Sequence, residues 1–167
     1  DWNEKEAQNM AKTRTYMDKY RFTTAENQRF ARANFTKLVH TNARFEGVNT
    51  TLPQTQTIMD GMSVAGVPVE DILTIVNLKR GWQYITAQNS PLTLTMEKQI
   101  NKIVAAEDAL VPGELRQGKG GVNLGSEDFF APPLINEKQE QSFLQKILAD
   151  PQMTTTDKAL TIMYHNM

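Results

Sequence analysis

The sequence predicts a mainly helical protein with one small β-hairpin. Before residue 108, apolar residues recur every three or four positions, as they do on the buried face of a helix. Between residues 108 and 133, glycines separate short extended pieces, and Val122-Asn123-Leu124 alternates as in a strand. After residue 136 the helical spacing returns. We therefore expect helices on both sides of a single hairpin.

The composition bounds the class of protein. The chain has 167 residues, 40% of them hydrophobic and 22% charged, which fits one globular domain with a sizeable core. The net charge is −1, whereas a protein that binds nucleic acid normally carries a strongly basic face, so no nucleic-acid partner is expected. The absence of cysteine excludes a disulfide framework and any cysteine-ligated metal.

The chain carries no signal for membrane insertion or export. No apolar run approaches the roughly 18 residues of a membrane span, and we expect no signal peptide. We expect a cytoplasmic protein without a membrane partner. Because the chain does not begin with Met, we also expect it to be a processed or incomplete piece of a longer protein.

Start and stop signals divide the helical pattern into segments. Threonines and asparagines stand at expected helix starts, and Gly and Pro stand at expected ends. The segment 69–87 is the most apolar, with a stripe made by Ile75, Leu78, Trp82 and Ile85, and it should be the central core helix. The expected helices span residues 4–20, 24–46, 52–64, 69–87, 95–104, 136–149 and 156–167.

The end of the second expected helix departs from the usual pattern. Gly47 stands where a helix takes its left-handed cap, which leaves Glu46 in the last turn. A carboxylate there is opposed by the helix dipole at a cost of about 0.3–1 kcal/mol. Glu46 is either a functional residue or a solvated surface charge. The apolar stripe of this helix is expected at Ala31, Phe35, Leu38, Asn42 and Phe45.

Several familiar sites are not expected. The segment Gly118-Lys119-Gly120-Gly121 is rich in glycine, but it lacks the spacing of a nucleotide-binding loop. His40 and His165 are the only histidines, and they lie on separate expected helices without other ligands at metal-binding spacing. The sequence therefore predicts neither a metal site nor a nucleophilic triad.

Several stretches resemble Fic-domain proteins, and two of them are the helical stretches at residues 72–85 and 94–104, with Asn101 where many members have His. Phe45-Glu46-Gly47-Val48-Asn49 is similar to the inhibitory segment of that family, in which Ser or Thr is followed after three residues by Glu and then Gly or Asn. Glu46 and Gly47 match the pattern, whereas Asn42 replaces the hydroxyl residue. The stretch 111–116 resembles the Pro-Gly-x-x-Arg start of the family's β-hairpin flap, with its return at 122–125 and its exit at Pro132-Pro133. The stretch 154–167 resembles the helix that precedes the catalytic signature HPFx[DE]GN[GK]R.

The resemblance implies a Fic-like helical bundle with one flap. The domain would span residues 1–167 and be incomplete at its C-terminus, with N-terminal helices and the inhibitory segment in 1–50 and core helices and flap in 51–167. Such proteins transfer AMP from ATP to hydroxyls of target proteins. ATP and Mg²⁺ are implied for the complete protein. Because the signature is not in the chain, we assign no catalytic residue, and we expect the chain alone to be inactive and to bind neither.

The resemblance also implies residue roles. Glu46 would pair with an Arg of the signature region and occupy the space that the γ-phosphate of ATP needs. A target protein would bind at the flap, and the apolar side of the final helix leaves a homo-oligomer open. Two other readings stay open: a non-catalytic interaction or inhibitory module that supplies Glu46 in trans, and a plain helical scaffold. The expected inhibitory residues are Asn42, Glu46 and Gly47, and the expected flap residues are Gly113, Glu114, Leu115, Arg116 and Val122.

Overall fold

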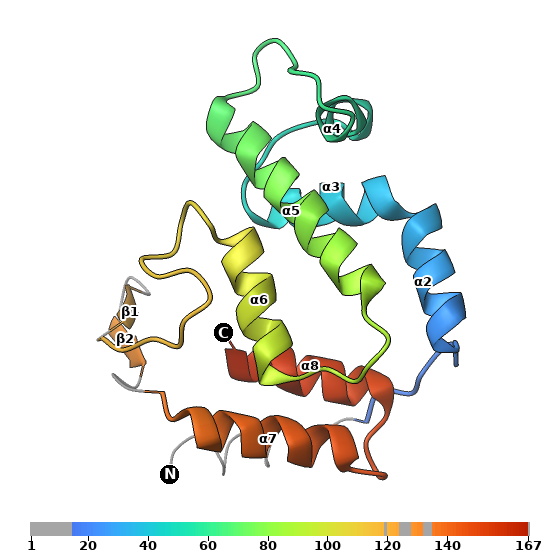
Figure 1. Ribbon diagram of the computed structural model, residues 1–167, viewed down its shortest axis with the longest axis vertical. Helices are drawn as coiled ribbons and strands as arrows, with labels where there is room; N and C mark the ends of the chain where they lie inside the picture. The colour runs from blue at the N-terminus through green and yellow to red at the C-terminus, as the bar shows by residue number, and fades with distance from the viewer. Residues whose placement is uncertain (1–14, 119, 124–127, 132–134, 167) are drawn as a thin grey trace. The chain divides into compact units, whose positions relative to one another are not determined.

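The structure, a computed structural model, describes residues 15–118, 120–123, 128–131 and 135–166. The mainly helical class is confirmed (Figure 1). The described chain divides into two compact units. The helical unit covers residues 22–114. The terminal unit comprises residues 15–21 and the described residues from 115 onwards.

The helical unit is built around one central helix. Its helices are α2 (Thr24–Ala33), α3 (Phe35–Phe45), α4 (Leu52–Met59), α5 (Val69–Ala87) and α6 (Leu94–Val104). The α5 helix contacts the other four and has the predicted bounds (Figure 1). Its Ile75 and Leu78 lie in the buried cluster, as expected, but Ile85 is 39% exposed. The cluster also contains Val39, Ala43, Val48, Ile58 and Met59.

The second expected helix is broken at Asn34. This residue has φ −112° and ψ 19°, and its Nδ2 donates to the carbonyl of Phe30 at 2.9 Å. An asparagine side chain that bonds the backbone of the preceding turn competes with helix continuation. The prediction of one continuous helix over 24–46 is therefore wrong, and two helices meet at this residue.

Two predicted helix boundaries also need correction. The α4 helix ends at Met59 rather than near Val64, because Gly61 adopts φ 90° and terminates it. The α6 helix begins two residues earlier than a cap at Thr95 would allow. Its cap is Thr93, whose hydroxyl accepts the Met96 N–H at 3.2 Å.

The terminal unit contains the two strands and the last two helices. The strands β1 (Gly120–Asn123) and β2 (Asp128–Ala131) pair antiparallel, with Val122 opposite Phe129. The helices α7 (Glu137–Ala149) and α8 (Thr155–Asn166) lie side by side (Figure 1). His165 Nε2 lies 2.7 Å from a carboxylate oxygen of Glu140, and its ring stacks on Phe143 with centroids 3.8 Å apart. These contacts join the two helices. As predicted, Asn136 caps α7.

Residues 15–20 are not helical, contrary to the predicted first helix; residues 4–14 lie outside the described range. The backbone here bonds to the start of α8 instead. Tyr16 donates its N–H to Asp157, and Asp18 accepts from the backbone N–H groups of Thr155 and Thr156. The first N–H groups of a helix have no acceptor within the helix, and the Asp18 carboxylate accepts two of those in α8. The segment 15–20 is therefore held by bonds to α8 rather than by hydrogen bonds of its own helix. These bonds also lower the pKa of the Asp18 carboxyl.

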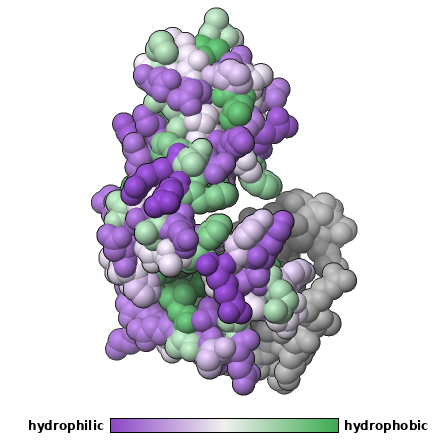
Figure 2. Space-filling view, turned by 90° about the vertical axis from the view of Figure 1, so that its right-hand side faces the viewer, coloured by the Kyte–Doolittle hydropathy of each residue, from purple (hydrophilic) through white to green (hydrophobic). Residues whose placement is uncertain are grey.

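The face drawn in Figure 2 carries mostly hydrophilic side chains, with hydrophobic ones in small groups between them. In the described part of the chain, no helix is long and apolar enough to cross a membrane.

Candidate functional site

The predicted inhibitory segment forms a closed helix end. Glu46 is the C-terminal cap residue of α3 and is exposed. Gly47 follows with φ 84°, in the left-handed conformation that was predicted. Gly47 donates its N–H to the carbonyl of Arg44 at 3.1 Å, and Val48 donates to that of Ala43 at 3.0 Å. This pair of bonds is the Schellman closure, which satisfies two carbonyls at the helix end. The backbone that carries Glu46 is therefore fixed.

The buried side of α3 differs from the predicted stripe. Val39 and Ala43 are fully buried, and Val48 joins them in the core cluster after the turn. Phe45, predicted on the stripe, is 82% exposed. The face of α3 that packs on the core runs through Phe35, Val39 and Ala43 at spacings of four, and Phe45 comes two residues after Ala43, roughly 200° around the helix, so it faces away from the core. Glu46 therefore projects from a helix that Phe35, Val39 and Ala43 hold on the core.

Asn42 contacts the central helix. Its Oδ1 accepts the indole N–H of Trp82 at 2.8 Å, and both residues are half-buried. The sequence placed Trp82 in the apolar stripe of α5 but did not reveal this bond. A Trp on a buried face usually finds a partner for its indole N–H, so the sequence alone could have predicted that Trp82 has a hydrogen-bond acceptor nearby. Asn42, Glu46 and Gly47 thus lie on one helix end, and Asn42 joins that end to α5.

The predicted start of the flap packs on α6. Gly113 is buried with φ 82°, and its N–H donates to Oδ1 of Asn101 at 2.9 Å. A Cβ added to Gly113 would lie 2.8 Å from Lys102 Cβ and 3.0 Å from the carbonyl oxygen of Lys98. Glu114 follows, with its carboxylate 3.6 Å from the Lys98 ammonium group. Gly113 therefore permits a close approach that a larger residue would prevent, and sequence reasoning had given Asn101 no role.

The other expected flap residues belong to the terminal unit. Leu115 is half-buried and Arg116 is exposed. Val122 lies in β1, but its side chain lies outside the part that is described. The rest of the expected return, 124–125, and the expected exit, 132–133, also lie outside the described residues. The target-binding role of all five flap residues stays a prediction.

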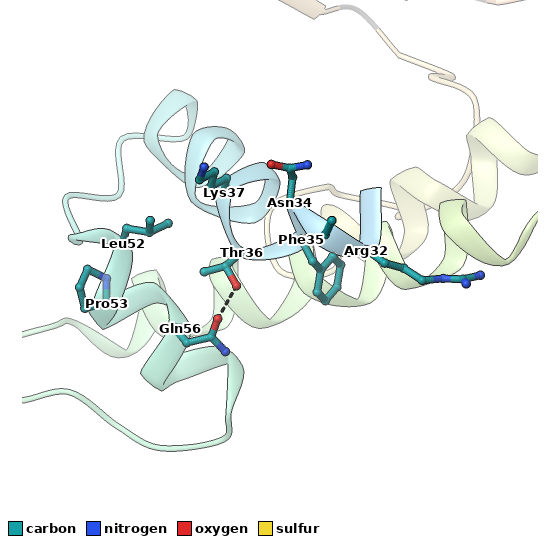
Figure 3. A pocket seen from close by; sticks show the side chains of 9 residues that line it. Arg32, Asn34, Phe35, Thr36, Lys37, Leu52, Pro53 and Gln56 are labelled. Atoms are coloured by element: carbon teal, nitrogen blue, oxygen red, sulfur yellow. Dashed lines mark hydrogen bonds between the residues drawn. The ribbon is translucent and has the colours of Figure 1, made fainter. Parts of the chain in front are cut away.

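A shallow hollow of about 380 Å³ lies where α2 and α3 meet the start of α4. The hydroxyl of Thr36 donates to Gln56 across it, and Phe35 and Leu52 contribute apolar surface (Figure 3). The side chains of Arg32 and Lys37 lie apart in this view, so they do not converge on one anion (Figure 3). The hollow is open, and Glu46 does not line it.

Neither histidine of the chain stands in a metal cluster. His40 Nδ1 lies 3.1 Å from the hydroxyl of Thr55, which is fully buried and also bonds Thr50 at 3.0 Å. His165 is paired with Glu140. Among the residues that the structure describes, no three His, Asp or Glu side chains are grouped to hold a metal ion. No step of a reaction is therefore assigned to a metal held by these residues.

Comparison with known proteins supports the fold. No family model matches the chain, and no curated protein sequence matches it. Among solved structures, the crystal structure of a Fic family protein from Desulfovibrio desulfuricans G20, at 2.70 Å resolution, is similar with a TM-score of 0.59. The match covers 83% of this chain and 49% of that one at 17% sequence identity, so the chain spans about half the length of that protein. The chain has a Fic-like fold.

Proposed function

We propose that the chain is the N-terminal and core portion of a Fic-type protein AMP-transferase whose activity is held down by Glu46. The observation that carries this proposal is the exposed Glu46 on a fixed helix end, followed by a left-handed Gly47, within a Fic-like fold. In the complete protein, a target protein docked at the flap supplies the hydroxyl that takes AMP from Mg²⁺-bound ATP, and pyrophosphate leaves.

Inhibition in this proposal is an electrostatic exclusion. The Glu46 carboxylate pairs with an arginine of the signature segment and occupies the place of the ATP γ-phosphate. ATP then binds with its α-phosphate displaced from the line of attack. Because phosphoryl transfer depends on positioning and charge stabilisation, a small displacement is costly in rate. The Schellman closure helps, since it leaves the backbone of Glu46 little freedom to withdraw.

The proposal is tested by Glu46→Gly in the chain extended by a Fic signature segment. Fold stability should change little, because Gly at a helix end costs less than about 1 kcal/mol. The AMP-transfer rate should rise by about a hundredfold if alignment recovers about 2.7 kcal/mol of transition-state stabilisation. Glu107→Gly, which also removes an exposed carboxylate, from the turn after α6, is the matched control and should leave the rate unchanged.

Two outcomes would contradict the proposal. Equal rates for the parent and Glu46→Gly proteins, at equal melting temperatures, would leave Glu46 as a surface charge. A rise of the same size in the Glu107→Gly control would show a general effect of net charge. A further experiment tests whether the chain is instead an inhibitory module that acts in trans. The unextended chain is added to the extended Glu46→Gly protein, and a fall in the AMP-transfer rate that requires Glu46 in the added chain would favour the inhibitory module.

A further inference from the structure

A directional contact joins the inhibitory segment, here residues 42–48, to the core helix α5. Asn42 Oδ1 accepts the Trp82 indole N–H at 2.8 Å, and the Asn42 carbonyl accepts the Glu46 N–H at 3.2 Å. Asn42 and Glu46 therefore lie one helical turn apart on the same side of α3. The contact fixes the turn from which Glu46 projects.

Apolar contacts also hold α3 on the core, through Val39, Ala43 and the partly buried Phe35. Val39 and Ala43 are small and fully buried, and contacts of this kind are not directional. A hydrogen bond requires its donor and acceptor to be aligned, so the bond from Trp82 adds a directional restraint on the angle of the last turn about the helix axis. Trp82 packs against the core cluster, which holds the indole in place.

We propose that Trp82 is the positioning residue of the inhibitory segment: by holding Asn42 it keeps Glu46 where it inhibits. This proposal rests on the proposed function and says which contact with the core keeps Glu46 in its inhibitory position. It also explains the departure from the Fic pattern at position 42. An asparagine carries its acceptor one bond further from the backbone than a Ser or Thr hydroxyl does, and here that acceptor meets the indole N–H.

The first test uses the chain itself and measures amide hydrogen exchange at Glu46, Gly47 and Val48. Asn42→Ala removes the acceptor and Trp82→Phe removes the donor. Either change should lower protection at these three amides by about twofold to tenfold, the factor that corresponds to a typical net hydrogen bond. The double variant should show no further fall, because both changes remove the same bond.

Gln28→Ala is the matched control. Gln28 donates to the Gln88 carbonyl at 3.1 Å and to Asn89 Oδ1 at 3.0 Å, so its loss removes side-chain bonds to the end of α5 within the same unit. It should leave the three amides unchanged. If Asn42→Ala and Trp82→Phe affect them no more than Gln28→Ala does, Trp82 does not position the segment.

The second test measures AMP transfer by the extended protein. Asn42→Ala and Trp82→Phe should each raise the rate by about twofold to tenfold, and neither should do so when Glu46→Gly is also present. A rate that rises with Glu46→Gly but with neither of the other variants overturns the inference and leaves the proposed function standing. If Glu46→Gly leaves the rate unchanged, the proposed function fails, and hydrogen exchange alone decides whether Trp82 holds the segment.

Discussion

Gly113→Ala tests how the start of the flap is held on α6. Two separate costs are expected. The residue has φ 82°, where an L-residue with a side chain costs about 1–2 kcal/mol. The new Cβ would also lie 2.8 Å from Lys102 Cβ and 3.0 Å from the Lys98 carbonyl oxygen, so helix backbone would have to shift. Overpacking of this kind typically costs about 1–3 kcal/mol. We expect a total loss of about 2–5 kcal/mol.

Gly66→Ala separates the two costs. Gly66 has φ 80°, but a Cβ there would meet nothing within 4 Å, so only the conformational cost of about 1–2 kcal/mol applies. The assay is urea unfolding followed by the fluorescence of Trp82 in a Trp2→Phe background. The dependence of the unfolding free energy on urea concentration should be the same in all variants. Equal losses for the two variants would show that the flap start does not press on α6, and the packing argument would be refuted.

Three further outcomes are expected. The hydrogen bonds from Thr156 and Thr155 lower the pKa of the Asp18 carboxyl from its ordinary value of 3.8. Their contribution to stability is therefore present above that pH and is lost as the pH falls below it. In thermal unfolding, the Asp18→Ala variant should be less stable than the parent near neutral pH, and its stability should depend less on acid. The chain should associate through the exposed Leu160, Met163 and Tyr164 of α8, and Met163→Glu should reduce this in light scattering; a monomer over a wide concentration range would contradict it. With labelled ATP, Mg²⁺ and a cell lysate, the unextended chain should label no protein above background, and labelling that depends on it would disprove this.

Local signals in the sequence determined much of the helical architecture. The bounds of α5, the cap at Asn136 and the left-handed Gly47 were predictable because each depends on neighbouring residues alone. Apolar periodicity and capping preferences act within one or two turns, and both survive in the folded chain. The position of Glu46 at the end of α3 follows from the same signals.

Tertiary structure decided which residues of those local elements contact one another. Trp82 meets Asn42 across 40 positions of sequence, Gly113 meets Asn101 across 12, and Asp18 meets Thr156 across 138. No period or spacing encodes such pairs, because each polar group could also have been satisfied by water in the unfolded chain. Only packing of the helices removes that alternative and selects the partner. The sequence could therefore locate the candidate inhibitory glutamate, but only the folded structure shows that Trp82 of the core bonds to the helix that carries it.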